Sequence, residues 1–348
     1  MTDPVSSSLL LPVTLLTGFL GSGKTTLINY LLKHNHDEKV IIIENEFGPV
    51  NIDSSLLNVS TEFQIVEMTN GCICCTVQGE LTEALHKLHA KRLTGELQFD
   101  RLIIETTGLA DPAPIIQTFF IDDLIRQTIQ LDGIITLVDA HHILKHLNEH
   151  PVTLSQIGFA DRIILTKTDC ISDQQKAEVI NRIHKINHKA TIFEAIKGQI
   201  PKSQWLDIHA FDLSDELTIN KGFFVINPTK KFEANFQPLP IQKQATLWGD
   251  NIRSYLFEAG ELDLKKIGSF MESLVEQYGN DMLRYKGVLA IKNNNQRLIV
   301  QGVHKVVGFD YGSPWQNLAE RISRLVIISR TLPFDELNKS FLKTVSDQ

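Results

Sequence analysis

The sequence is poor in cysteine, has no long apolar run and carries no excess of basic residues. Only four of its 348 residues are cysteine, and Cys72, Cys74 and Cys75 fall within four positions, which does not suit a disulfide framework. No apolar run approaches the roughly 20 residues of a membrane helix. The opening Ser6 to Leu16 also lacks the basic flank of a signal peptide. We therefore expect a cytoplasmic protein with reduced thiols and no membrane partner.

The formal net charge is -7. Nucleic acids and anionic membranes are bound by clustered Lys and Arg, so we expect neither as a partner. A phosphate ligand would need a local site. The length of 348 residues, set against about 150 residues per domain, predicts two domains.

The first part of the chain alternates short apolar runs with segments long enough for crossover helices. This pattern is typical of a parallel sheet covered on both faces, and it predicts an α/β fold with a mostly parallel sheet. The expected strands are Val13 to Thr17, Val40 to Ile43, Gln64 to Met68, Leu102 to Ile104, Ile134 to Val138 and Arg162 to Leu165, and the expected helices are Lys24 to His34, Glu80 to Leu93 and Asp173 to Asn187.

The composition changes after about Phe224, where Asn227-Pro228 and Pro238-Leu239-Pro240 are typical of a linker. We expect a first domain over 1–225, a linker over 226–244 and a smaller α+β domain over 245–348. Asn293 to Asn295 is a hairpin turn signal. The second domain should contain strands Ser254 to Phe257, Gly287 to Ile291, Arg297 to Val307 and Leu325 to Ser329, and helices Leu264 to Tyr278 and Asp335 to Leu342.

The pattern G-x-x-x-x-G-K-[ST] occurs over Gly18 to Thr25, after an apolar strand and at the start of a helix, as in a P-loop NTPase. Its glycines allow backbone N–H groups to surround phosphates, and the helix N-terminus adds positive potential. Lys24 can reach the β and γ phosphates, and the Thr25 hydroxyl can bind Mg²⁺. We predict a nucleotide site with magnesium as cofactor.

A second phosphate element is expected at the end of another core strand, and Glu105 to Gly108 follows Leu102 to Ile104. An acidic residue there can hold the magnesium shell or orient water, while the Gly108 N–H meets the γ-phosphate. We therefore assign Lys24 and Glu105 as the candidate catalytic residues.

Base selection is assigned to Thr166-Lys167-Thr168-Asp169. The Asp169 carboxylate can accept hydrogen bonds from both N–H groups of the guanine edge, while the aliphatic part of Lys167 covers the ring. Adenine would leave this carboxylate poorly paired. This favours GTP. A plain strand-to-helix turn with Asp169 as a cap is the alternative.

The segment Asn70-Gly71-Cys72-Ile73-Cys74-Cys75 places three thiols at i, i+2 and i+3. Such thiolates can converge on one soft ion, and zinc, cobalt(II) and copper(I) all accept sulfur ligands. Three ligands leave one position open, which suits transfer of the ion. Buried packing cysteines or a redox pair are the alternatives.

Further candidate ligands lie elsewhere in the chain. Glu44 or Glu46 follows the second strand, where a P-loop fold has a switch segment, so this acidic pair could report nucleotide state to the metal. Two helical sets of histidines could also bind metal, although a solvated helix face would explain them as well. These sets are His142, His146 and His150, and His184 with His188.

Together, five segments resemble the CobW-type metal-chaperone GTPases, especially the YjiA branch, and the resemblance covers most of the chain. They are GFLGSGKTT at 18–26, ENEFG at 44–48, NGCICC at 70–75, ETTGLADP at 105–112 and TKTD at 166–169. The family fold is a P-loop NTPase domain followed by a smaller α+β domain.

The resemblance implies a weak GTPase that binds GTP and GDP and whose nucleotide state controls metal delivery to client metalloproteins. Mg²⁺ and Zn²⁺ are the implied cofactors, with Co²⁺ or another transition metal as a further choice. It implies phosphate binding by Gly18 and Gly21, Ser22, Gly23, Lys24, Thr25 and Thr26 with Gly108, a magnesium region at Thr25 and Glu105, guanine recognition by Lys167 and Asp169, and zinc binding by Cys72, Cys74 and Cys75 with Glu44 as a candidate ligand.

Two departures qualify this resemblance. Thr166 stands where many GTPases have Asn, which predicts the loss of one contact to the base or the P-loop. Pro49 stands where some relatives carry a further acidic residue. Two other functions fit the same motifs: an ATP-dependent P-loop kinase for a small metabolite, and a nucleotide-binding module with structural zinc.

Overall fold

The computed structural model describes residues 10–35, 38–45, 63–67, 76–210, 224–225, 252–315 and 321–346. Contacts divide the chain into two compact units, which are described separately. The first is drawn from Met1–His141, Ala160–Ile171 and Thr191–Asp212, and the second from His142–Phe159, Ser172–Ala190 and Leu213–Gln348. The expected linker at 226–244 lies outside the described residues.

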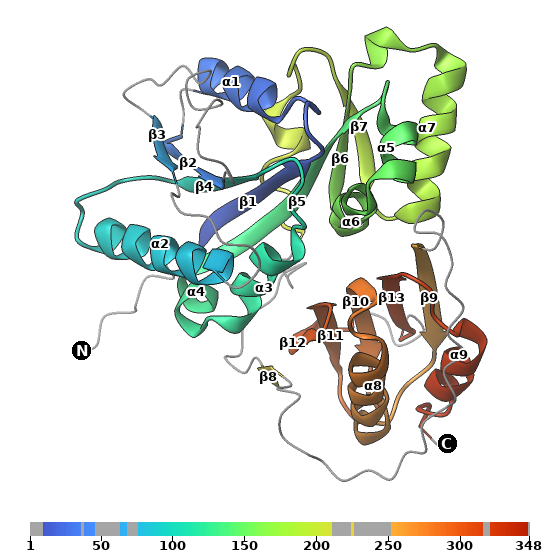
Figure 1. Ribbon diagram of the computed structural model, residues 1–348. Coiled ribbons are helices and arrows are strands. Elements are labelled where there is room, and N and C mark those ends of the chain that lie inside the picture. The colour runs from blue at the N-terminus through green and yellow to red at the C-terminus, as the bar shows by residue number, and fades with distance from the viewer. Residues whose placement is uncertain are drawn as a thin grey trace. The chain divides into compact units, whose positions relative to one another are not determined.

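The first unit is built on a sheet of seven described strands in the order β3-β2-β4-β1-β5-β6-β7 (Figure 1). Every neighbouring pair is parallel, which confirms the predicted α/β class. The strands are β1 (Leu11–Gly18), β2 (Val40–Asn45), β3 (Phe63–Glu67), β4 (Arg101–Thr106), β5 (Ile129–Asp139), β6 (Arg162–Thr166) and β7 (Thr191–Ala195).

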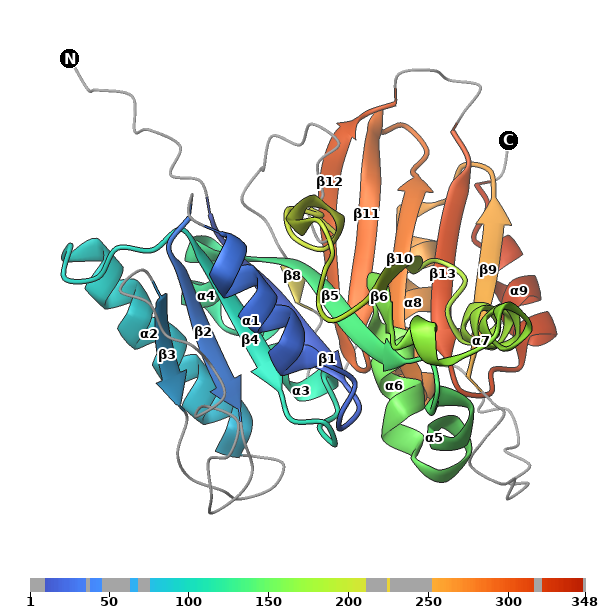
Figure 2. The same ribbon diagram turned by 90° about the horizontal axis from the view of Figure 1, so that it is seen from above.

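Helices cover both faces of this sheet. Figure 2 shows α1 (Lys24–His34) on one face and α2 (Thr76–Leu93), α3 (Ala113–Ile121) and α4 (Asp123–Thr128) on the other. The buried apolar side chains of α1 are Leu27, Ile28, Leu31 and Leu32, a spacing that places one apolar face toward the sheet. They join β1, β2 and β4 residues and Trp205 in one core cluster.

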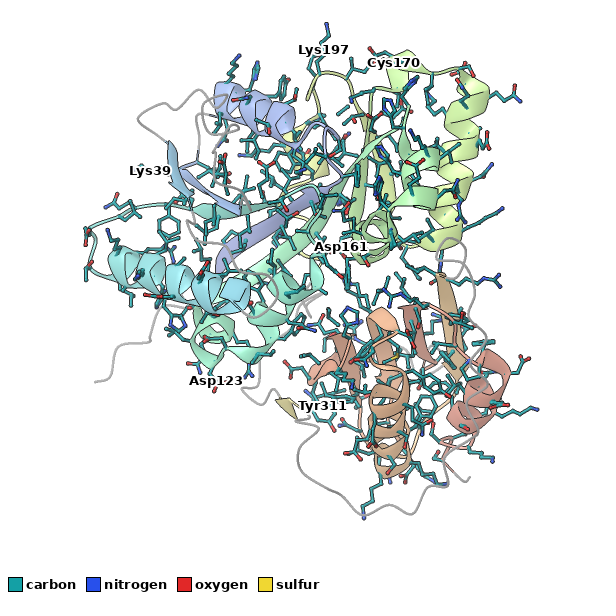
Figure 3. The ribbon with its side chains drawn as sticks, in the orientation of Figure 1. Lys39, Asp123, Asp161, Cys170, Lys197 and Tyr311 are labelled. Carbon is teal, nitrogen blue, oxygen red and sulfur yellow. The ribbon has the colours of Figure 1, made fainter. Side chains whose placement is uncertain are left out.

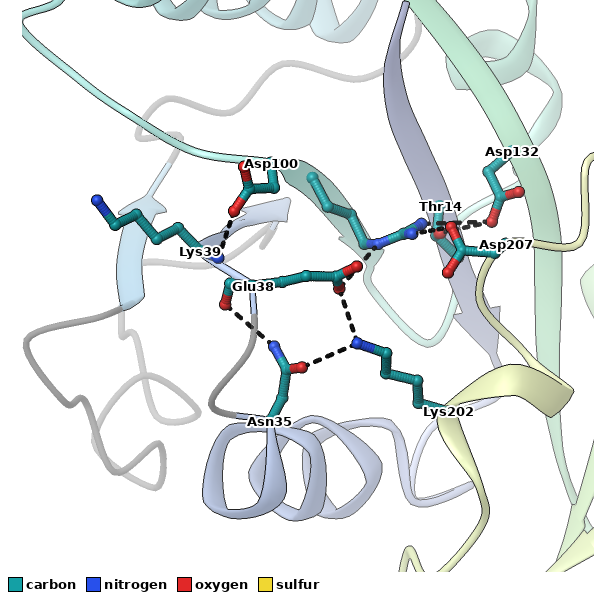
Figure 4. Close-up of polar contacts among 9 residues, drawn as sticks. Thr14, Asn35, Glu38, Lys39, Asp100, Asp132, Lys202 and Asp207 are labelled. Carbon is teal, nitrogen blue, oxygen red and sulfur yellow. Dashed lines mark hydrogen bonds and ion pairs between the residues drawn. The ribbon is translucent and has the colours of Figure 1, made fainter. Parts of the chain in front are cut away.

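Charged side chains fill the end of the sheet where β4 begins (Figure 4). Arg101 is 2% exposed; its guanidinium contacts Asp207 and lies 3.5 Å from Asp132 and 3.7 Å from Glu38. Lys202 reaches Glu38 at 3.2 Å. Burial raises the pKa of Asp132, and the nearby Arg101 opposes that shift. This cluster ties the segment around Lys202 and Asp207 to the start of β4, far along the strand from the predicted site.

The second unit contains an antiparallel sheet of six described strands in the order β8-β12-β11-β10-β13-β9. The expected α+β domain is therefore present. Apolar side chains of α8 and α9 join this sheet in one core cluster, while α6 contacts β10 and α7 contacts β9. The strands are β8 (Phe224–Val225), β9 (Arg253–Ala259), β10 (Met282–Ala290), β11 (Gln296–Val303), β12 (Val306–Pro314) and β13 (Ser323–Ser329), and the helices are α5 (Ile143–Glu149), α6 (Pro151–Phe159), α7 (Asp173–Ile186), α8 (Leu264–Tyr278) and α9 (Phe334–Leu342).

One strand prediction was wrong. Arg297 to Val307 was expected as a single strand, but β11 ends at Val303 and β12 begins at Val306, with Val303 paired to Val306. The chain turns at His304, which adopts a left-handed φ of 51°. The two turn residues, His304 and Lys305, include none of the Gly, Asn or Asp that mark a tight hairpin, so the hairpin gave no clear sequence signal. Among the described residues, no helix combines the length and apolar character needed to cross a bilayer.

Candidate nucleotide-binding site

The P-loop connects β1 to α1 through three glycines with positive φ. Gly18, Gly21 and Gly23 have φ of 139°, 71° and 101°, a region that side chains disfavour. A Cβ on Gly18 would also lie 2.3 Å from the Leu137 carbonyl oxygen of β5. A side chain at Gly18 would therefore clash with β5, and the positive φ values at all three positions favour glycine.

The two predicted P-loop side chains lie at the start of α1. Lys24 is 8% exposed, and its Nζ donates to the Gly18 carbonyl at 2.9 Å. Thr25 is half-buried and Thr26 exposed in the same first turn. An ammonium held against the loop backbone can exchange this carbonyl for phosphate oxygens without unfolding the helix.

The end of β4 lies directly beside the P-loop. Glu105 is the register partner of Leu16 on β1 and is only 9% exposed. The Thr106 hydroxyl donates to the Thr17 hydroxyl at 2.9 Å. A Cβ on Gly108 would lie 2.5 Å from the Leu20 backbone nitrogen, so the segment after β4 packs backbone to backbone against the P-loop. The structure thus brings Glu105 and Gly108 to the predicted phosphate site.

Glu44 lies on the next strand at the same level. It is 4% exposed and is the register partner of Glu105, while Glu67 of β3 is in turn the partner of Glu44. Parallel strands all end on the same side of the sheet, and ligands bind at these carboxyl ends in α/β folds. Two buried carboxylates on adjacent strands suit a cation, because like charges disfavour each other's ionised form. This donor set fits hard ions such as Mg²⁺.

Cys72, Cys74, Cys75 and Glu46 lie outside the described residues. The described chain stops at Glu67 of β3 and resumes at Thr76, where α2 starts. Cys170, the remaining cysteine of the sequence, is exposed in the short turn η2 (Thr168–Cys170) after β6 (Figure 3).

The predicted base-recognition residues follow β6. Lys167 has a left-handed φ of 56°, and its Nζ lies 2.7 Å from Asp139 Oδ2 at the end of β5. Asp169 is exposed at the start of η2. Sequence reasoning missed Asp139, whose carboxylate is 5% exposed. Its place as the last residue of the strand next to β6 was the available signal, because Asp139 is the register partner of Thr166.

Thr166, at the end of β6, contacts the P-loop directly. Its hydroxyl donates to the Ser22 carbonyl at 2.8 Å, and both residues are buried. The threonine therefore makes one contact between β6 and the P-loop, and the expected loss of a contact stays a prediction for the base.

A further loop beside α1 gave no recognised sequence signal. A Cβ on Gly198, whose φ is 78°, would lie 2.7 Å from the Thr26 carbonyl oxygen. The adjacent Lys197 also has positive φ, at 52°, and is labelled in Figure 3. The turn after β7 thus approaches the first turn of α1.

Comparisons with known proteins agree with this geometry. The family model described as "CobW/HypB/UreG, nucleotide-binding domain" matches residues 12–194, and that of the "Cobalamin synthesis protein cobW C-terminal domain" matches residues 252–345. The zinc chaperone YjiA of Escherichia coli is 38% identical over 330 residues, covering 94% of this chain and 97% of that protein. The zinc chaperone CobW of Pseudomonas aeruginosa is 30% identical over 94% of this chain and 90% of its own.

A solved structure supports the same assignment. The crystal structure of Zn(II)-bound YjiA GTPase from E. coli matches with a TM-score of 0.72 and 32% identity, covering 97% of this chain and 100% of that chain. The predicted resemblance is confirmed in both domains. The chain belongs to the CobW/HypB/UreG family of nucleotide-binding proteins and carries the CobW C-terminal domain.

Proposed function

We propose that this protein is a GTP-hydrolysing metallochaperone that binds zinc through Cys72, Cys74 and Cys75 and delivers it to a client metalloprotein under nucleotide control. The observation that carries the proposal is the register of Glu105, beside the P-loop, with Glu44 and of Glu44 with Glu67. Glu67 precedes Cys72 by five residues in the sequence. The names of the relatives, zinc chaperone and GTPase, support the same function.

Nucleotide binding is assigned to the P-loop and the turn after β6. The backbone N–H groups from Gly21 to Thr26 hold the phosphates, and Lys24 neutralises the β and γ oxygens. Thr25 and Glu105 hold the magnesium region, where the ion would offset phosphate charge during transfer to water. Lys167 covers the base while Asp169 pairs with its edge, and Asp139 orients Lys167 through the 2.7 Å contact.

Nucleotide state and metal affinity are coupled because Glu44 and Glu105 are neighbours on one sheet edge. When GTP orders the segment from Glu105 to Gly108, it also restricts the motion of the neighbouring end of β2. A metal ion bound near Glu44 then binds more tightly, because less conformational freedom is lost on binding. By linkage, GTP and zinc must strengthen each other by the same factor, typically about 5- to 150-fold.

The test is zinc affinity measured with a nonhydrolysable GTP analogue and with GDP. We expect tighter binding with the analogue, loss of zinc binding in Cys74→Ala, and reduced coupling in Glu44→Gln. Glu83→Gln, which changes an exposed carboxylate on α2, serves as the matched control. Equal affinities with both nucleotides would reject the coupling.

Two cheaper measurements separate the other functions. A preference for ATP in competition, with transfer of phosphate to a small acceptor, would identify a kinase. Unfolding of the protein by chelation would identify structural zinc, since a chaperone loses only its cargo.

A further inference from the structure

Three histidines in and beside α5 repeat at intervals of four residues, a spacing that places them on one helix face. His142 precedes the helix and His150 follows it, with His146 between them. Two helical backbone hydrogen bonds link them, because His146 N donates to the His142 carbonyl at 3.0 Å and His150 N to the His146 carbonyl at 2.8 Å. Residues four apart on such a helix are neighbours.

The imidazole rings follow this register. His142 and His146 have ring centroids 5.8 Å apart with planes 16° from parallel, and His146 and His150 have centroids 5.9 Å apart. The buried residues of α5 are Ile143 and Leu147, each 2% exposed. The helix therefore buries its aliphatic side, while His142 is exposed and His146 and His150 are half-exposed.

The spacing is compatible with two imidazoles sharing one ion. Zinc–imidazole bonds are about 2.0–2.1 Å long, so two nitrogens on a tetrahedral ion lie roughly 3.3 Å apart. Side-chain rotation can bring rings with centroids below 6 Å to that separation. The one described cation on α5, Lys145, lies 4.0 Å from Glu149, which offsets its repulsion of a metal ion.

We propose that His146 forms an exposed second metal site, binding one borderline divalent ion such as Cu²⁺, Ni²⁺ or Zn²⁺ together with His142 or His150. Imidazole suits these ions, and histidines at i and i+4 on one helix face are a known zinc-binding arrangement. Among the described residues, no group of three or more His, Cys, Asp and Glu side chains is placed to hold an ion, so the proposed site has two protein ligands and water would fill its other positions. The site therefore exchanges metal readily, and it does not depend on the thiol site proposed above.

The test uses the full chain with Cys72, Cys74 and Cys75 changed to Ala, so that thiolate binding cannot contribute. Cu²⁺ is the probe, because its electron paramagnetic resonance spectrum shows coupling to ligand nitrogens. We expect one bound Cu²⁺ with coupling to two nitrogens. Adding His146→Ala removes the histidine common to both pairs and should weaken Cu²⁺ affinity about 100-fold or more. Loss of a residue that only hydrogen-bonds to a metal ligand already costs about 10- to 100-fold in metal affinity.

Two controls make the result decisive. His34→Ala, which removes an exposed histidine at the end of α1, should leave Cu²⁺ affinity unchanged. His142→Ala should leave the pair of His146 and His150, with a smaller loss than His146→Ala. Unchanged affinity in His146→Ala, or absence of nitrogen coupling in the cysteine-free background, would overturn the assignment. Neither result would bear on the thiol site.

Discussion

Replacement of Thr166 by valine tests the contact that joins β6 to the P-loop. Valine has nearly the same shape as threonine, so the change removes a hydroxyl and leaves little cavity. The lost bond is the 2.8 Å donation to the Ser22 carbonyl, and Thr166 and Ser22 are 7% and 1% exposed. Water therefore has poor access to the carbonyl in the variant.

The size of the effect follows from this burial. An ordinary hydrogen bond contributes about 0.5–1.5 kcal/mol, but a buried acceptor left unpaired costs about 1–3 kcal/mol. The Thr166 hydroxyl also lies 3.3 Å from the Val138 carbonyl, but its single proton serves the shorter contact. If the whole cost falls on P-loop positioning, GTP affinity should fall by about 5- to 150-fold, because 1.4 kcal/mol corresponds to a factor of ten.

The assay is the dissociation constant of a nonhydrolysable GTP analogue, measured beside the melting temperature of the nucleotide-free protein. Thr166→Ser keeps the hydroxyl and is the control, so its affinity should stay near that of the parent. Equal affinity and melting temperature in Thr166→Val and the parent would refute the reasoning. An equal loss in Thr166→Ser would show that the methyl group, rather than the hydrogen bond, matters.

Two further predictions concern the same site. Gly108→Ala should reduce GTP hydrolysis at least about tenfold in a phosphate-release assay, because the added Cβ would lie 2.5 Å from the Leu20 backbone. The control is Gly79→Ala, where an added Cβ meets nothing within 4 Å. Asp139→Asn should weaken GTP binding by about fivefold in a binding titration, because Lys167 is partly exposed and its ion pair with Asp139 is worth about 1 kcal/mol. The control is Asp123→Asn, which changes a side chain that is 82% exposed and should leave GTP affinity unchanged.

The P-loop could be predicted from sequence because its determinants are local. The glycines, the lysine and the hydroxyl residue occupy fixed positions between one strand and one helix. The pattern G-x-x-x-x-G-K-[ST] specifies each of these residues. Glu105 could be predicted because a polar residue ending an apolar run marks the edge of a parallel sheet. The same logic applied to β5 would have found Asp139.

Other features depend on contacts between residues far apart in the chain. The bond from Thr166 to Ser22 spans 144 positions, and no local pattern records which carbonyl a threonine hydroxyl will meet. The Arg101 cluster likewise joins Glu38, Asp132 and Asp207, which are charged residues that sequence reasoning assigns to the surface. The hairpin at His304 was missed because its turn relies on flanking strand pairing in place of glycine or asparagine.

The order of the strands explains why a metal site and a nucleotide site could act on each other without a long pathway. Glu67, Glu44 and Glu105 occupy matching register positions on β3, β2 and β4, and Glu105 matches Leu16 just before the P-loop. The buried carboxylates of Glu44 and Glu105 lie on adjacent strands, so a cation bound beside them would lower their mutual repulsion. Under the proposed function, the magnesium of the nucleotide and the bound transition metal would both interact with this pair of carboxylates. Coupling of the two sites would then need only a change of charge at the carboxyl ends of neighbouring strands.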